Sequence, residues 1–89
     1  MSVSLNSKLR KTLGRIFQVP VPSDLPWRDI VVLFEGLGAD VSQGRGSRVR
    51  VFLNGEVATF HEPHPERVAP KGQVKAVKEF LKRSGIAPE

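Results

Sequence analysis

The segment 46–61 constrains the fold of this chain more than any other stretch, because it has the pattern of a β-hairpin. Asn54-Gly55 separates two runs in which apolar and polar residues alternate. An Asn-Gly pair in that setting is the strongest short-range signal for a two-residue hairpin turn. Such a turn places Leu53 opposite Glu56, and this one pair determines the register of all the others.

The predicted register divides the hairpin into a core face and an exposed face, because directly opposed residues lie on the same side of a sheet. It places Arg48 opposite His61 and Arg50 opposite Thr59. The expected core face carries Val49, Val51, Leu53, Ala58 and Phe60. The expected exposed face carries Arg48, Arg50, Phe52, Val57, Thr59 and His61. Guanidinium groups and an imidazole on one open sheet face suit the binding of a phosphate backbone.

The charge balance also favours a polyanionic or acidic partner. Lys and Arg number 14 against 9 for Asp and Glu, which gives a formal charge of +5 and a pI near 10.3. A surplus of this size is typical of proteins that bind nucleic acid or an acidic protein. The 89 residues suffice for one small domain, 1–89.

Composition excludes several classes of protein. The sequence has no cysteine, so neither a disulfide framework nor a thiolate metal site can form. It has no apolar run of the roughly 18 residues that a membrane span needs. Residues 1–8 lack the apolar middle of a signal peptide. We therefore expect a cytoplasmic protein that is not inserted in a membrane.

Apolar residues at helical spacing predict the remaining elements. Helices are expected over 8–17, from about 26 to 37 and from about 71 to 84, and a short strand over 40–43. Without the first helix the order is α-β-β-β-α, which predicts an α+β fold with a three-stranded antiparallel sheet and both helices on one face. Residues 8–24 would form an extra N-terminal helix and its connector, and residues 25–87 the core.

His61 and His64 are the only histidines, and they are the best candidates for proton transfer. RNA cleavage through the ribose 2′-hydroxyl needs a base, an acid and cationic stabilisation of the transition state. His61 would supply the base or the acid, and His64 the other group, with Arg48 and Arg50 supplying charge. The alternative is that His61 is an ordinary exposed strand residue and His64 an ordinary loop residue.

Further cations extend the candidate RNA-binding surface. Four lysines fall along one side of the last predicted helix: Lys71, Lys75, Lys78 and Lys82. Lys71 and Lys75 are the candidates for phosphate contacts, as is Arg45 in the glycine-rich turn before the hairpin. The alternative reading of the lysines is a solvated helix face. Trp27 could stack on a base, but its place at a helix start favours a core position.

A metal site is the weaker alternative for the segment 61–66. His61, Glu62, His64 and Glu66 are close in sequence, and such side chains bind zinc. Prolines restrict the loop on both sides of His64, however, and the sequence offers no further histidine or cysteine ligand. We expect no metal and no other cofactor.

These features together resemble the HicA toxins over about residues 26–87. The resemblance is carried by the α-β-β-β-α order, Gly46-Ser47, Asn54-Gly55, His64-Pro65, and Lys71-Gly72-Gln73-Val74 leading to Gly85-Ile86. It implies a double-stranded-RNA-binding-like fold and a ribosome-independent endoribonuclease that cleaves mRNA without a metal. It also implies a HicB-type antitoxin partner that masks the basic face.

One residue departs from the family pattern. Most HicA toxins read Gly-Ser-His where this chain reads Gly46-Ser47-Arg48, and that histidine is catalytic in the family. The hairpin register places His61 opposite position 48, so its imidazole could reach a similar point. The alternatives are a non-catalytic RNA-binding module of the same fold and an interaction domain for an acidic protein.

Overall fold

The computed structural model describes residues 5–88 and has the element order that the sequence predicts. Three helices and three strands follow in the order α1 Ser7–Ile16, α2 Trp27–Gly36, β1 Asp40–Gln43, β2 Arg48–Leu53, β3 Glu56–His61 and α3 Lys71–Arg83. The predicted bounds are confirmed to within a residue or two. Pro26 differs slightly from its expected first-turn place, because its extended backbone makes it the N-cap of α2.

The three strands form one antiparallel sheet in the order β1-β2-β3. The hairpin register is the predicted one, with Leu53 opposite Glu56 and Arg48 opposite His61. Asn54 and Gly55 both adopt positive φ, 50° and 83°. These are the residue types that tolerate the left-handed region, so the turn closes in two residues.

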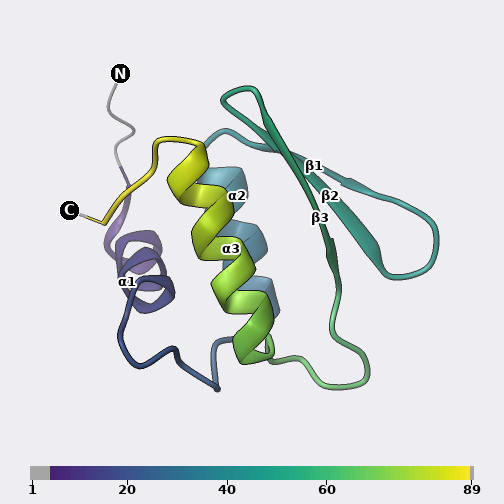
Figure 1. The fold of residues 1–89 in the computed structure, drawn as a ribbon, viewed down its shortest axis with the longest axis horizontal. Coiled ribbons are helices and arrows are strands. Elements are labelled where there is room, and N and C mark those ends of the chain that lie inside the picture. Colours follow the sequence, from purple (N-terminus) through teal and green to yellow (C-terminus); the bar gives the residue numbers. More distant parts are fainter. Residues whose placement is uncertain (1–4, 89) are drawn as a thin grey trace.

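The helices all lie on one side of the sheet (Figure 1). Figure 1 shows α2 and α3 beside each other against the sheet, with α1 on the side of this helix pair that faces away from the sheet. The core between the layers centres on Phe60, whose ring lies 5.8 Å from that of Phe34 and 6.0 Å from that of Phe80. Trp27 joins this cluster at 5.9 Å from Phe60, which confirms its predicted core position.

Helix α1 covers the outer side of the helical layer. Asn6 caps it by accepting a hydrogen bond from the Leu9 amide at 2.8 Å. Leu13 and Ile16 are buried against the other helices. A Cβ built on Gly36 would lie 2.4 Å from Leu9 Cδ1, so the glycine makes room for α1 at the end of α2.

The hairpin turn is also joined to the end of α3. The Asn54 side-chain amide donates to the Ser84 carbonyl at 2.8 Å. Gly85 then turns the chain with φ of 80°, and the Ile86 amide donates to the Leu81 carbonyl at 2.9 Å. Ile86 packs on the core, as expected of an apolar residue after a helix-ending glycine.

The connection between β3 and α3 is held by backbone hydrogen bonds to the segment before α2. The Trp27 amide donates to the Arg67 carbonyl and the Ala69 amide to the Leu25 carbonyl, each at 2.9 Å. The last residues of the proline-rich loop are therefore attached to the start of α2.

No helix within residues 5–88 is long and apolar enough to cross a bilayer.

Replacing Asn54 by glycine should lower the free energy of unfolding by about 1 kcal/mol, which is the usual net contribution of one hydrogen bond. Glycine keeps the left-handed turn but cannot donate to the Ser84 carbonyl. Urea unfolding followed by circular dichroism measures the difference. Asn54→Asp should be more damaging, because its carboxylate would face a carbonyl oxygen. A glycine variant as stable as the wild type would show that the hydrogen bond contributes nothing.

Candidate active site

The sheet face opposite the helices carries three cross-strand rows of exposed residues. The rows are Asp40–Phe52–Val57, Ser42–Arg50–Thr59 and Gly44–Arg48–His61. We call this surface the outer face. The row nearest the Asn54-Gly55 turn is apolar and acidic, whereas the other two carry the guanidinium groups and the imidazole. The predicted division into core and exposed residues is confirmed.

Arg48 and His61 form the closer of the two kinds of antiparallel pair. The Glu62 amide donates to the Ser47 carbonyl at 2.7 Å, which makes that pair a hydrogen-bonded one. Pair types alternate along an antiparallel ladder, so Arg48 and His61 form a non-hydrogen-bonded pair. In such pairs the Cα atoms lie about 4.5 Å apart and the side chains are in contact range.

Gly44 completes this row on the β1 side. Its amide donates to the Arg48 carbonyl at 2.8 Å. A Cβ built on Gly44 would lie only 3.3 Å from the Arg48 Cβ. The glycine therefore leaves Arg48 without a side-chain neighbour on β1, and His61 is the one neighbouring side chain in its row. The glycine-rich sequence of this segment predicts only a turn, although the β1–β2 register, extended by one residue, places Gly44 opposite Arg48.

The backbone at His61 is tied to α3. The Gln73 side-chain amide donates to the His61 carbonyl at 2.8 Å. This bond joins the end of β3 to the first turn of α3 and restrains the backbone that carries the imidazole. Gln73 belongs to the Lys71-Gly72-Gln73-Val74 segment that carries the family resemblance, but that segment does not predict its contact with the strand end 12 residues earlier, because the contact depends on the packing of the two layers.

The cationic side chains of the outer face are available to an external ligand. Among residues 5–88, the side chains of Arg48, Arg50 and His61 make no hydrogen bond or ion pair. Arg15 and Arg83, by contrast, pair with Asp24 and Glu56. An external anion could therefore bind the outer face without displacing an internal carboxylate.

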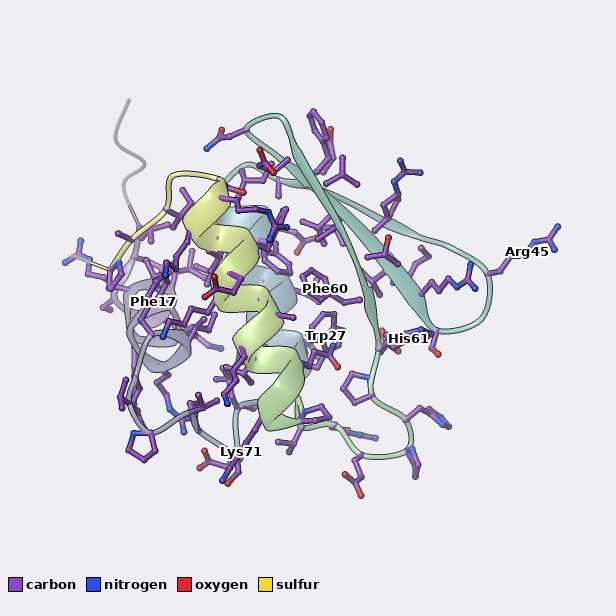
Figure 2. All side chains as sticks on the ribbon, in the orientation of Figure 1. Phe17, Trp27, Arg45, Phe60, His61 and Lys71 are labelled. Carbon is purple, nitrogen blue, oxygen red and sulfur yellow. The ribbon has the colours of Figure 1, made fainter. Side chains whose placement is uncertain are left out.

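Arg45 and His64, two further candidate residues, lie in the segments next to this row. Arg45 is exposed in the turn between β1 and β2, at the same end of the sheet as His61, and extends away from the sheet (Figure 2). His64 is exposed in the loop that follows β3, three residues beyond His61. Both belong to segments that begin or end beside the Gly44–Arg48–His61 row.

The lysines lie in the other layer. Lys71 and Lys75 are exposed on α3, which covers the inner face of the sheet. Figure 2 shows Lys71 at the start of α3, separated from His61. Lys78 lies over the ring of Phe17, the C-cap residue of α1, 6.0 Å from its centroid. The structure thus brings the arginines and His61 together on one surface and places the lysines on another.

A pocket that no sequence motif predicts lies at the same end of the sheet, on the helix side. It has a volume of about 520 Å³ and is lined by Pro26, Trp27, Arg28, Asp29, Val31, Gln43, Glu62, Pro63 and Arg67. Its residues come from α2, β1 and the loop after β3. No local pattern in the sequence marks such a pocket, because three separate segments form it.

Within the described part of the chain, no three His, Cys, Asp or Glu side chains are grouped so as to hold a metal ion. The alternative of a zinc site in the segment 61–66 therefore has no support in the geometry.

The chain matches a known protein family. Residues 27–86 match the model described as HicA toxin of bacterial toxin-antitoxin. The match runs from the start of α2 to Ile86 and leaves α1 outside. No curated protein and no solved structure shows significant similarity to the chain.

The close pairing of positions 48 and 61 can be tested by cross-linking. Cysteines introduced together by Arg48→Cys and His61→Cys should form an intramolecular disulfide on mild oxidation, because a non-hydrogen-bonded pair meets the distances that a disulfide requires. The natural chain has no cysteine, so thiol titration and a non-reducing gel report only this bond. Arg50→Cys with His61→Cys is the matched control. That diagonal pair, about 7–8 Å apart, should remain reduced. Equal oxidation of both pairs would contradict the register.

Proposed function

The chain belongs to the HicA family of bacterial toxin–antitoxin systems, and we propose that it is a toxin that cleaves mRNA as a metal-independent endoribonuclease. The proposal rests on one observation above all, which is the cross-strand pair of Arg48 and His61 on an otherwise open face. This pair would account for Arg48, the residue at which the chain departs from the family pattern. In place of the imidazole that most HicA toxins have at position 48, the chain would use the imidazole of His61 on the neighbouring strand.

The proposed reaction is transfer of the phosphoryl group within the RNA strand. A base removes the proton of the ribose 2′-hydroxyl, and the 2′-oxygen forms a bond to the adjacent phosphorus. The bond from phosphorus to the 5′-oxygen of the next nucleotide breaks, and an acid protonates that oxygen. The products are a 2′,3′-cyclic phosphate and a free 5′-hydroxyl. His61 takes one of the two proton-transfer roles and His64 is the candidate for the other.

Arg48 and Arg50 provide the charge that this reaction needs. Negative charge accumulates on the phosphoryl oxygens in the transition state, and fixed cations beside them lower its free energy. Because these guanidinium groups have no carboxylate partner among residues 5–88, they are free to contact the phosphate. Arg45, at the same end of the sheet, would then bind a neighbouring phosphate of a longer RNA, whereas Lys71 and Lys75 on α3 would contact only phosphates further along the strand.

The proposed protein partner is a HicB-type antitoxin in the cytoplasm. Phe52 and Val57 are exposed by 47% and 44%, and they form an apolar row beside the arginines. An antitoxin segment with apolar and acidic side chains would match both ends of the outer face. Covering Arg48 and Arg50 in this way would block the RNA and neutralise the charge that attracts it.

The competing functions share the same surface but differ in chemistry. A non-catalytic RNA-binding module would bind RNA through the outer face without cleaving it. A domain that only binds an acidic protein would do so without competition from RNA. Cleavage of RNA therefore separates the proposed function from both.

His61→Ala should abolish cleavage of a long RNA in the presence of EDTA while leaving RNA affinity nearly unchanged. Removing a proton-transfer group typically slows a reaction by 10²- to 10⁴-fold. The measurement is the rate of product formation on a denaturing gel, with affinity from fluorescence anisotropy.

Thr59→Ala is the matched control, since Thr59 is exposed in the next row of the same face. It should cleave at about the wild-type rate. If His61→Ala cleaves as fast as the control, His61 is not the catalyst, and His64→Ala becomes the variant to measure. Binding without cleavage by the wild type would instead support the non-catalytic module.

Removing two charges from the outer face should weaken RNA binding and its salt dependence together. Each lost contact with single-stranded RNA reduces the slope of log K against log salt by about 0.7. Arg48→Ala with Arg50→Ala should therefore reduce the slope by about 1.4. Lys8→Ala with Lys11→Ala changes the net charge equally on α1 and should leave the slope unchanged. Equal changes in both variants would argue against a specific role of the outer face.

A further inference from the structure

The 520 Å³ pocket lies directly behind the candidate active site. Gln43 lines the pocket and immediately precedes Gly44, while Glu62 lines it and immediately follows His61. Gln43 is opposite Val49, a buried core residue, so its side chain belongs to the inner face. The pocket and the Gly44–Arg48–His61 row therefore occupy the two sides of the same sheet end.

The lining combines apolar walls with hydrogen-bonding groups. Trp27, Val31 and Pro63 supply apolar surface. Asp29, Gln43 and Glu62 supply carboxylate and amide groups, and among residues 5–88 none of these three side chains has a hydrogen-bond partner. Small-molecule sites generally have this composition, with few polar groups that orient the ligand, and volumes of about 300–1,000 Å³.

The lining also carries two exposed guanidinium groups beside the two carboxylates already named, and these cations could contact an anionic group of the occupant. Arg28 and Arg67 line the pocket, are exposed, and form no ion pair within the described residues. A ligand with a flat apolar body, polar edges and an attached phosphate matches the walls, the polar groups and the guanidinium groups together. In an RNA strand, the ligand that fits this description is a nucleotide whose base is unstacked from its neighbours. Proteins that recognise RNA sequence stack such bases on planar side chains and form hydrogen bonds with the edges of the bases.

We propose that this pocket binds an unstacked nucleobase of the RNA, adjacent to the phosphate held by Arg48 and His61. The proposal rests on the proposed function and names the form of its substrate, which is a single-stranded segment. The strand would pass round the sheet end, with the reacting phosphate on the outer face and the neighbouring base on the inner side. A base paired in a duplex could not enter the pocket without leaving its partner.

Trp27 makes the proposal directly measurable. It is the only tryptophan in the chain, so intrinsic indole fluorescence reports on this residue alone. Its Nε1 is also the one buried side-chain nitrogen or oxygen without a hydrogen-bond partner among the described residues. Binding against this wall should therefore change the fluorescence of the protein.

The first experiment titrates the full-length wild-type protein with guanosine monophosphate and, separately, with ribose 5-phosphate. Guanosine monophosphate should give a saturable change in Trp27 fluorescence, after correction with free tryptophan amide for absorbed light. Ribose 5-phosphate should give none, because it carries the phosphate without the base. Equal responses to both, or no response to either, would overturn the proposal.

Two phenylalanine variants link the fluorescence signal to the pocket. Gln43→Phe fills the pocket from its exposed edge and should weaken guanosine monophosphate binding at least tenfold. Lys11→Phe places the same side chain on the exposed side of α1, outside both the pocket and the outer face, and should leave that binding unchanged. Circular dichroism confirms that both fold. Retained binding in Gln43→Phe would place the nucleotide elsewhere and overturn the proposal.

The same variants separate this inference from the proposed function. The fluorescence titration does not depend on cleavage. If the wild type binds guanosine monophosphate in the pocket but does not cleave RNA, the pocket proposal is supported and the nuclease proposal is contradicted. If Gln43→Phe cleaves a long single-stranded RNA at the wild-type rate, the pocket proposal fails while the nuclease stands.

Discussion

The two-residue turn at Asn54-Gly55 is the constraint on which the candidate site depends. Both residues adopt the left-handed conformation, which closes the hairpin in a single register. A slip of one residue would turn the side chains of one strand to the opposite face, because side chains alternate with a period of two. The Asn54 amide adds a second restraint through the Ser84 carbonyl, so the turn is held by the end of α3 as well.

Burial of the inner face explains why the outer face is available for binding. Phe60 packs against Phe34 and Phe80 from the two helices that cover the sheet. With α1 also on that side, no element within residues 5–88 covers Arg48, Arg50 or His61. Exposed cations without carboxylate partners attract an anion over a distance of about a Debye length, roughly 8 Å at physiological salt. An open, basic and partly apolar face suits both an RNA and a protein that competes with it.

The end of the sheet combines features that no single element provides. Its outer side holds the Gly44–Arg48–His61 row, and its inner side holds the pocket beside Trp27. Contacts from the helical layer stabilise both sides. Gln73 holds the His61 carbonyl, and the bond from the Trp27 amide to the Arg67 carbonyl joins the loop to α2. A nucleotide chain that follows this edge would meet cations, an imidazole and an apolar pocket in succession.

Local sequence patterns were enough to predict the hairpin, its register, the division of its two faces and, to within a residue or two, the bounds of the helices. The hairpin follows from positive φ at Asn54 and Gly55 and from the alternation of side chains along a strand, and the helices follow from apolar residues at helical spacing. Tertiary packing was needed to place Lys71 and Lys75 in the other layer from Arg48, to bring Gln73 to the strand end, and to form the pocket. Those features arise where segments distant in sequence are brought together by burial of a common apolar core. A local sequence pattern does not specify such packing.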